Sequence, residues 1–268
     1  MKKLLQNPII KIVFGLVFCY LPLLLVNLLI LKPLAVQFSL SDELSRVLRF
    51  VINSIMILLA YYLFVNWTED KAEFDWRMRF LFRDSGAGAL LAIGSISIVI
   101  LVLSIIGTYQ VQGASFSLRS LLYLLIVFAF MSIMEEVLFR GVVYRIAEKL
   151  LGTSPALVLS VLIFGLPHLF NQDANWVSML AASIGGLLLG LLFTLSRQLW
   201  MPIAFHWFWN FSQVYYGSNL SGSAEFADKA LIKSSLTGAA WLTGGTAGIE
   251  NSMITIGLTI IVSIALIF

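Results

Sequence analysis

The segment Leu121–Gly141 reads LLYLLIVFAFMSIMEEVLFRG, and it places two adjacent glutamates and an arginine directly after thirteen residues that favour hydrocarbon. Apolar residues resume after the charged ones, so the helical pattern is predicted to continue past Glu135, Glu136 and Arg140. An ionisable side chain in a membrane-spanning helix is costly unless it faces the bundle interior and finds a partner. The alternative is a helix that ends at Met134 and leaves both acids solvated at the membrane boundary.

The composition of the whole chain indicates a membrane protein. Of its 268 residues 60% are hydrophobic and 12% are charged, and the mean hydropathy is +0.95, values far from those of soluble globular domains. A helix needs about 20 apolar residues to cross the hydrocarbon core of a bilayer. The fold class is therefore predicted to be an all-α, polytopic bundle of about eight transmembrane helices. We expect these spans near residues 9–31, 50–67, 87–107, 119–145, 155–171, 176–195, 199–216 and 252–268.

The basic residues predict how the chain is oriented in the membrane. With the N-terminus in the cytoplasm, 11 of the 17 Lys and Arg residues fall in segments on the inner side. Cytoplasmic segments carry such an excess, so both termini are predicted to be cytoplasmic. This asymmetry explains why the chain carries more basic than acidic residues. No basic cluster is dense enough to indicate a nucleic acid as partner.

The three charged residues of the opening segment divide into a pair and a single acid. Glu136 and Arg140 are spaced i, i+4 with the acid first, which favours an ion pair on one helix face. Glu135 lies about 100° further round the helix. The spacing therefore predicts that Glu135 has no partner on its own helix.

The two histidines of the chain also lie in predicted spans. His168 follows Phe164 by one turn in FGLPHLF, and His206 precedes Asn210 by one turn in FHWFWN. Counted at about 1.5 Å per residue along the spans, these groups reach a depth similar to that of Glu135. We expect them to converge on one site in or near the inner half of the membrane, with access from the cytoplasm or laterally from the bilayer.

A free glutamate, two histidines and an asparagine in a low-dielectric pocket indicate a particular chemistry. A desolvated carboxylate acts as a general base on water, and a neutral imidazole beside it shares the proton transfer. The amide of Asn210, with His206 on the same helix face, supplies donors for a developing oxyanion. The set contains no covalent nucleophile, so it fits hydrolysis of an amide bond by water.

The same residue types leave a metal site open as an alternative. Glu135, His168 and His206 form a possible zinc set with an open fourth position. However, the chain has no HExxH or HxxEH spacing, and the three ligands would come from three separate helices. The metal-independent route is therefore favoured, and no cofactor is predicted ahead of it.

The three polar segments together resemble a known family. EEVLFR, FGLPH and HWFWN are similar to the motifs EExxxR, FxxxH and HxxxN of the CPBP intramembrane proteases, which include the type II CAAX prenyl proteases and bacterial bacteriocin-processing or immunity proteins. The resemblance covers about residues 120–212. It implies a single membrane domain, residues 1–268, in which 120–212 form the catalytic core and 1–119 and 213–268 supply flanking spans and connectors.

The resemblance also implies roles for the motif residues. Glu135 would be the base that activates water, assisted by His168. His206 and Asn210 would hold the oxyanion. In this family a glutamate mechanism competes with a metalloprotease interpretation, so the zinc alternative stays open at this point.

The remaining motif residues would support the site. Glu136 and Arg140 would be a structural ion pair that fixes their span, and Phe164 would shape the pocket wall. Outside the motifs, Gly186 and Gly190 form the small-residue pattern GLLLG. That pattern predicts close packing of this helix against a neighbour and no chemistry.

The function expected from the resemblance is that of an intramembrane endopeptidase in the plasma membrane of a bacterium. Its partners would be membrane lipids and an apolar or lipidated protein or peptide substrate. The alternatives are a transporter or channel with a polar relay and a pseudo-protease that serves in immunity or as a scaffold. A relay needs polar residues towards both faces, whereas the outer halves of the spans at 119–145, 155–171 and 176–195 look apolar.

Overall fold

A computed structural model describes residues 4–69, 75–170 and 175–268 of the chain. The α-helices are α1 (Pro8–Val26), α2 (Lys32–Gln37), α3 (Asp42–Thr68), α4 (Leu81–Ile105), α5 (Leu118–Glu136), α6 (Arg145–Leu151), α7 (Thr153–Gly165), α8 (Trp176–Ser196), α9 (Trp200–Tyr215), α10 (Ala240–Thr243) and α11 (Met253–Ile267). Two segments are π-helical, η2 (Asn27–Leu31) and η5 (Val137–Tyr144). The 3-10 turns are η1 (Leu4–Gln6), η4 (Met78–Phe80), η6 (Leu166–Phe170), η7 (Ala227–Lys229), η8 (Gly245–Ala247) and η9 (Ile249–Asn251), and the strands are β1 (Tyr109–Ala114) and β2 (Ile232–Leu236).

The all-α membrane bundle is confirmed, but the number of long spans is smaller than predicted. Helices occupy all eight predicted positions. Among the described residues, six helical segments are long and apolar enough to cross a membrane. The other two, α9 with 16 residues and α11 with 15, are roughly 22 to 24 Å long and fall short of a hydrocarbon core of about 30 Å. Length and composition thus support six of the eight predicted spans, and α9 and α11 are the shorter helices at the other two positions.

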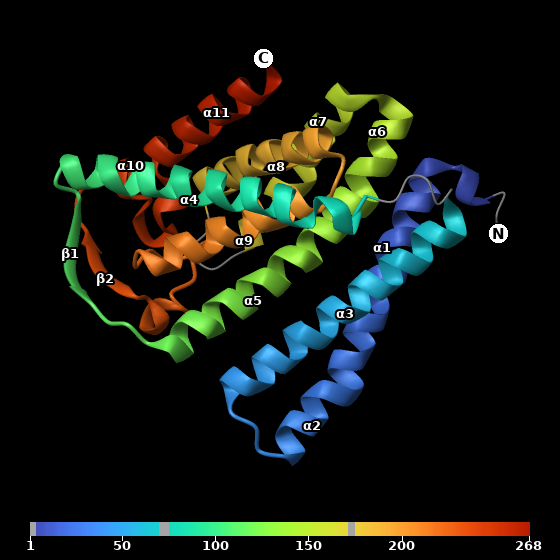
Figure 1. The fold of residues 1–268 in the computed structure, drawn as a ribbon, viewed down its shortest axis with the longest axis horizontal. Helices are drawn as coiled ribbons and strands as arrows, with labels where there is room; N and C mark the ends of the chain where they lie inside the picture. The colour runs from blue at the N-terminus through green and yellow to red at the C-terminus, as the bar shows by residue number, and fades with distance from the viewer. Residues whose placement is uncertain (1–3, 70–74, 171–174) are drawn as a thin grey trace.

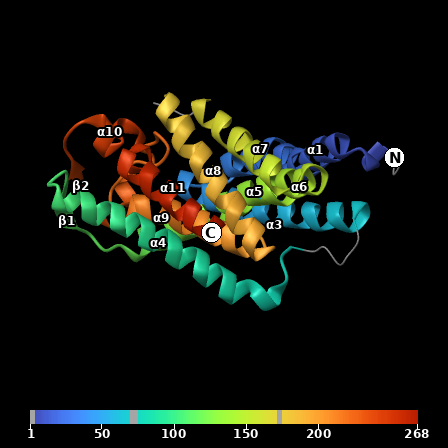
Figure 2. The same ribbon diagram turned by 90° about the horizontal axis from the view of Figure 1, so that it is seen from above.

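Helix α9 lies at the centre of the bundle. It packs against α4, α5 and α8, and nine of its 16 residues are buried. In Figures 1 and 2, α4 runs alongside α9, the antiparallel pair α1 and α3 lies at one side of the molecule, and the β1–β2 ribbon lies at the opposite edge. Because protein surrounds α9, polar side chains on this helix can face other side chains instead of lipid.

A small antiparallel ribbon, which the hydrophobic pattern does not predict, covers one end of the bundle. Strands β1 and β2 pair from Tyr109 with Leu236 to Ala114 with Ile232. The carbonyl of Tyr216, directly after α9, accepts hydrogen bonds of 2.8 Å from the hydroxyls of Tyr109 and Ser234. Residues 217–251, called the connector below, are thereby tied to the C-terminal end of α9.

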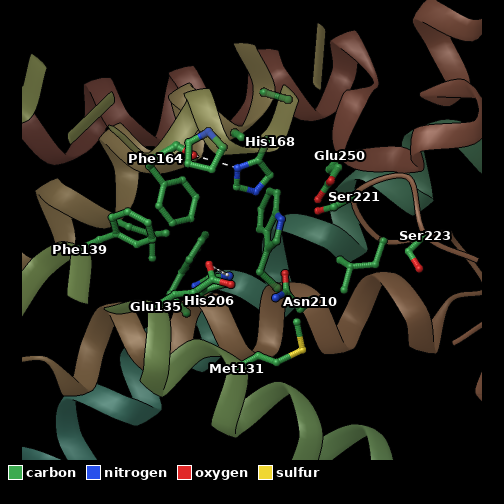
Figure 3. A pocket seen from close by; sticks show the side chains of 18 of the residues that line it. Met131, Glu135, Phe139, Phe164, His168, His206, Asn210, Ser221, Ser223 and Glu250 are labelled. Atoms are coloured by element: carbon green, nitrogen blue, oxygen red, sulfur yellow. Dashed lines mark hydrogen bonds and ion pairs between the residues drawn. The ribbon is translucent and has the colours of Figure 1, made fainter. Parts of the chain in front are cut away.

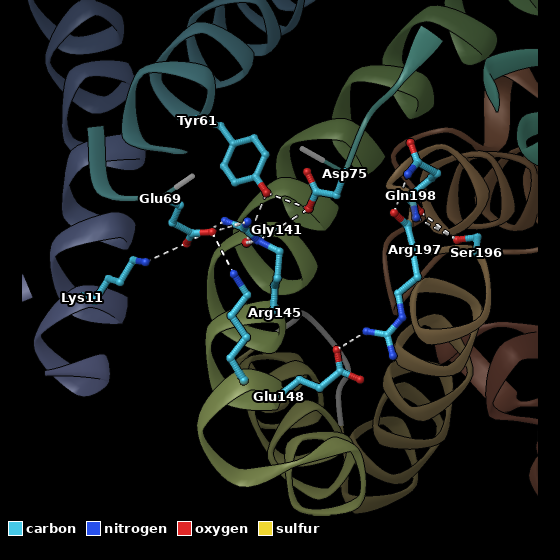
Figure 4. Close-up of polar contacts among 11 residues, drawn as sticks. Lys11, Tyr61, Glu69, Asp75, Gly141, Arg145, Glu148, Ser196, Arg197 and Gln198 are labelled. Atoms are coloured by element: carbon cyan, nitrogen blue, oxygen red, sulfur yellow. Dashed lines mark hydrogen bonds and ion pairs between the residues drawn. The ribbon is translucent and has the colours of Figure 1, made fainter. Parts of the chain in front are cut away.

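A charged network occupies the other end of the bundle (Figure 4). Its centre is Glu69, just after α3, which forms ion pairs with Arg145 at 2.6 Å, Lys11 at 2.8 Å and Lys149 at 3.1 Å. Arg145 Nε also lies 3.6 Å from a carboxylate oxygen of Asp75. The network joins the start of α1, the end of α3 and α6. This end carries basic residues that the sequence assigns to the cytoplasmic side.

The pKa values of the two acids in this network shift in opposite directions. Burial opposes the charge of Glu69, but the attraction of Arg145 and then of Lys11 outweighs it and lowers the pKa of Glu69 below its ordinary value. For Asp75 burial is the dominant effect and raises the pKa of the carboxyl, although Arg145 and the hydroxyl of Tyr61 act against it. Glu69 therefore carries the negative charge that binds the basic side chains of the network.

The GLLLG pattern marks the contact of α8 with α7, as predicted. A Cβ atom on Gly186 would lie 2.9 Å from Cβ of Phe164 and 3.2 Å from the carbonyl oxygen of Ser160. A Cβ on Gly190 would lie 2.9 Å from the side chain of Leu157. No side chain fits at Gly186 unless α7 moves, whereas at Gly190 the end of the Leu157 side chain would have to shift.

We predict that Gly186→Ala destabilises the protein by about 1–3 kcal/mol, the usual range for overpacking a tight contact. The added methyl group pushes against Phe164 on the backbone side, where the neighbour cannot rotate away. The measurement is the thermal midpoint of purified protein in detergent.

Gly94→Ala in α4 is the matched control, because a Cβ there meets no atom within 4 Å. Its midpoint should stay equal to that of the wild type or rise slightly, since alanine is the better helix former. Equal midpoints for the two variants would show that α7 and α8 are not in tight contact at Gly186.

Candidate active site

A cavity of about 710 Å³ opens between the central helices. Its walls come from α3, α5, η5, α7, η6, α8, α9 and α11, with the connector at one end. Glu135, Phe164, His168, His206 and Asn210 all line it (Figure 3). Residues from the three motifs, which are far apart in the sequence, therefore meet in one space of a size typical for ligand pockets.

Glu136 and Arg140 lie behind the cavity wall instead of lining it. The Arg140 guanidinium donates to Oε1 of Glu136 at 2.7 Å, and neither side chain has exposed surface. The i, i+4 spacing thus produces the ion pair that it predicts. A buried pair of this kind is costly to break from one side, because the remaining charge stays without compensation.

Arg140 makes two further contacts that hold α7 and α8 in place. Its second terminal nitrogen donates to the carbonyl of Gly186 at 3.2 Å, and its guanidinium carbon lies 4.4 Å from the centre of the Phe164 ring. The Gly186 carbonyl also accepts from the hydroxyl of Ser160 at 3.2 Å. No motif predicts this role, because a backbone carbonyl is common to every residue and leaves no pattern in the sequence.

The helix changes type directly after the two glutamates. Helix α5 ends at Glu136 and continues as the π-helix η5, where the sequence predicted an uninterrupted α-helix. Glu135 and Phe139 line the cavity. The carbonyl of Gly141 within η5 accepts from Arg145 Nε at 2.9 Å and from the hydroxyl of Tyr61 at 3.3 Å. Single π-helical turns of this kind often occur at functional sites, and these two donors anchor this one.

His206 bridges the two glutamates. Its Nδ1 lies 2.9 Å from Oε1 of Glu136, and its Nε2 lies 3.9 Å from Oε2 of Glu135. An ionised carboxylate only accepts hydrogen bonds, so Nδ1 of His206 carries a proton. In the neutral ring, Nε2 is then an acceptor that faces Glu135. The same atom becomes a donor only when the ring takes up a second proton.

His168 stands on the opposite side of the cavity from Glu135 and His206 (Figure 3). It lies in the 3-10 turn η6, directly after Pro167, and its Nδ1 donates to the carbonyl of Phe164 at 2.9 Å. The neutral ring therefore presents Nε2 as an acceptor. The ring of Phe164 is centred 5.3 Å from that of His168 and 5.9 Å from that of His206, so this side chain forms the wall between the histidines.

The geometry does not fit the zinc alternative. In the described part of the chain, no group of three or more His, Cys, Asp or Glu side chains lies close enough together to hold a metal ion. The Nδ1 atoms of His168 and His206 are engaged, and the Nε2 atoms belong to opposite walls. The predicted trio with Glu135 is thus not arranged as a ligand set, and a metalloprotease assignment finds no support here.

The cavity extends from Glu135, His206 and Asn210 towards the connector, which the sequence did not predict. Ser221, Ser223 and Glu250 line this end. Gln213, on α9 and fully buried, donates from Nε2 to the Glu250 carboxylate at 3.2 Å. The polar residues His206, Asn210 and Gln213 recur on α9 at helical spacing. The sequence contains this pattern, but no family motif includes Gln213.

This polar lining changes one expectation. The outer halves of the spans looked apolar, yet the connector and α11 add hydroxyl and carboxyl groups there. On the other side of the site, the fully buried pair Glu136 and Arg140 lies behind the cavity wall.

Comparison with known proteins supports the family predicted from the motifs. Residues 117–212 match the model of the family described as type II CAAX prenyl endopeptidase Rce1-like. The matched part is about a third of the chain and contains α5 to α9 almost completely. No curated protein and no solved structure gives a significant match.

Adjacent glutamates should respond differently to the same substitution. We predict that Glu136→Gln lowers the free energy of unfolding by about 3–5 kcal/mol, because Arg140 then stays buried without a carboxylate. Glu135→Gln should change it by less than about 0.5 kcal/mol, since that side chain is 37% exposed and its contact with Nε2 of His206 is as long as 3.9 Å. Unfolding titrations in mixed micelles measure both values. A Glu136→Gln protein as stable as the Glu135→Gln protein would contradict the structural role of the buried pair.

Proposed function

We propose that this chain, whose residues 117–212 carry the signature of the type II CAAX prenyl endopeptidase Rce1-like family, is an intramembrane endopeptidase that uses an activated water molecule. The observation that carries the proposal is the pair Glu135 and His206. Their Oε2 and Nε2 atoms are 3.9 Å apart and face the same cavity. That separation leaves room for one water molecule within hydrogen-bond distance of both atoms.

In the proposed reaction, Glu135 takes a proton from this water as the oxygen attacks the carbonyl carbon of the scissile peptide bond. Nε2 of neutral His206 accepts a hydrogen bond from the second O–H group of the water and so orients it. The tetrahedral intermediate collapses when the C–N bond breaks and the amine leaves with the proton that Glu135 received. Atoms and charges balance without a covalent intermediate on the protein.

The remaining two residues act on the substrate in this proposal. The side-chain amide of Asn210, one turn after His206, donates to the oxyanion that forms at the carbonyl oxygen. His168 on the opposite wall presents Nε2 as an acceptor and helps to hold the peptide. Glu136 acts through His206, because its hydrogen bond fixes the tautomer of that ring.

The lining of the cavity suits an apolar or lipidated peptide. Much of the wall around the catalytic groups is apolar and is formed by Phe139, Phe164, Leu188, Leu189, Phe205 and Trp209. We place the polar end of the substrate at the connector, where Ser221, Ser223 and Glu250 can bind its backbone. The bilayer is proposed to be the plasma membrane of a bacterium, with its lipids and a membrane-associated or lipidated protein or peptide as partners and no part for a nucleic acid.

The test is cleavage of quenched fluorescent peptides, both apolar and lipidated, by protein in nanodiscs. We expect Glu135→Gln to lower kcat by about 10²–10⁴, and Asn210→Ala by about 10²–10³. His168→Ala should also lower kcat. Cleavage by the wild type should survive a zinc chelator, because no step of the proposed reaction uses a metal.

Glu43→Gln is the control variant, since Glu43 lies outside the cavity and pairs with Arg119 and Lys229. It should cleave within a few-fold of the wild type. Loss of activity on chelation would move the assignment to a metal mechanism. Equal activity of folded Glu135→Gln and wild type would reject the role of Glu135. A wild type that is silent on every peptide would favour immunity or binding without proteolysis.

A further inference from the structure

One carboxylate of the catalytic cavity, that of Glu250, lies away from the groups assigned to the proposed hydrolysis. Glu250 belongs to the 3-10 turn η9, where the connector forms one end of the cavity. Figure 3 shows it next to Ser221 and apart from Glu135 and His206. All four residues line the same space of about 710 Å³, so a ligand that occupies this space can contact Glu250 and the catalytic groups together.

Glu250 has no positively charged partner in the described part of the chain. The charged residues that line the cavity there are the acids Glu135, Glu225 and Glu250 and a single cation, Arg46. Arg46 forms an ion pair with Glu225, so these two charges compensate each other. The Glu250 carboxylate accepts one hydrogen bond, of 3.2 Å, from the neutral amide of Gln213. A carboxylate that is partly removed from water without a cation favours a cationic ligand.

The turn that carries Glu250 is anchored to two helices. The carbonyl of Ile249 accepts a hydrogen bond of 2.6 Å from the hydroxyl of Thr255 on α11. The side-chain amide of Asn251 donates to the hydroxyl of Ser178 on α8 at 2.7 Å. Both neighbours of Glu250 in the sequence are thus buried and held. Because the turn is ordered before a ligand arrives, little conformational freedom is lost on binding.

A second polar side chain of the lining also lacks a partner. Asn210 is only 8% exposed, yet its side-chain amide makes no hydrogen bond with a described residue. Buried amides are normally hydrogen-bonded. The Asn210 amide therefore indicates a polar ligand, such as a peptide backbone, in the space between the catalytic groups and the connector end.

The spacing along α9 relates Glu250 to the catalytic groups. Gln213, which contacts Glu250, lies about two helical turns after His206, or roughly 10 Å along the helix. An extended peptide spans about 3.3 Å per residue. A peptide bond next to His206 is therefore about three residues away from a side chain that reaches Glu250.

We propose that the substrate of this cavity is an apolar segment with a lysine or arginine about three residues from the scissile bond, and that Glu250 binds this cation. Oε1 of Glu250 makes no hydrogen bond with the described residues and accepts from the ammonium or guanidinium group. The apolar wall binds the flanking side chains. An acidic side chain at the same position is rejected, because it meets Glu250 without a cation between them. The inference rests on the proposed hydrolysis for the place of the scissile bond.

The test is peptide binding by the full chain with Glu135→Gln, in nanodiscs, followed by fluorescence anisotropy. This substitution stops the proposed cleavage and removes Glu135 as a competing acid. Labelled apolar peptides with blocked termini carry lysine, norleucine or glutamate at the position indicated above, on one side of the central bond or the other. On one side, the lysine peptide should bind about tenfold or more tightly than the norleucine peptide, the factor expected for a hydrogen bond between charged groups. The glutamate peptide should bind most weakly.

Substitutions of Glu250 identify the residue that recognises the charge. Addition of Glu250→Gln should remove the preference for lysine, and Glu250→Lys should reverse it in favour of glutamate. Glu43→Gln is the matched control, because Glu43 lies outside the cavity at the same end of the molecule and pairs with Arg119 and Lys229. It should keep the preference for lysine.

Equal binding of the lysine and norleucine peptides on both sides would overturn the proposal, and this comparison needs no substitution of Glu250. A preference that survives Glu250→Gln in folded protein would also overturn it. Butylammonium that binds as tightly as the lysine peptide would overturn the peptide as the source of the cation. No cleavage is measured here, so failure of the proposed hydrolysis would appear in the cleavage assay alone.

Discussion

One carboxylate oxygen, Oε1 of Glu136, accepts hydrogen bonds from both Arg140 and His206 at a point with no exposed surface. In a low-dielectric interior each of these contacts is worth more than in water, and the removal of any one partner leaves a charged or polar group without compensation. The oxygen therefore fixes three elements relative to one another: the end of α5, the start of η5 and the middle of α9. Arg140 extends the constraint to α8 through the carbonyl of Gly186.

Because Glu136 is bound to Arg140 and His206, the neighbouring Glu135 remains directed at the cavity. Glu136 and Arg140 neutralise each other inside the wall, so Glu135 contributes the negative charge that faces the cavity next to His206. Glu136 also keeps the proton of His206 on Nδ1, which leaves Nε2 directed at Glu135. Two identical side chains in sequence thus differ in function because one is buried against a cation and the other is partly exposed.

The sequence predicted the parts of this arrangement that periodicity encodes. The i, i+4 spacing of Glu136 and Arg140 predicted their ion pair, the GLLLG pattern predicted close packing of α8 against a neighbour, and apolar runs predicted the helices. The sequence did not predict the contact of His206 with Glu136, because the pairing of residues 70 positions apart depends on tertiary packing. The same holds for the ribbon, since β1 and β2 pair residues that are far apart in the sequence. Nor did it predict η5, since a π-helix depends on its backbone hydrogen bonds more than on hydrophobic period.

The same buried pair bounds the cavity on one side. Glu136 and Arg140 fill the wall behind Glu135, and the lining continues along the face of α9 that carries His206 and Asn210 to the connector. The charged network around Glu69 stabilises the opposite end of the bundle. The hydrolysis proposed above needs such an asymmetry: a space for water and substrate on one side of Glu135, and on the other a rigid wall that keeps Glu135 and His206 in register.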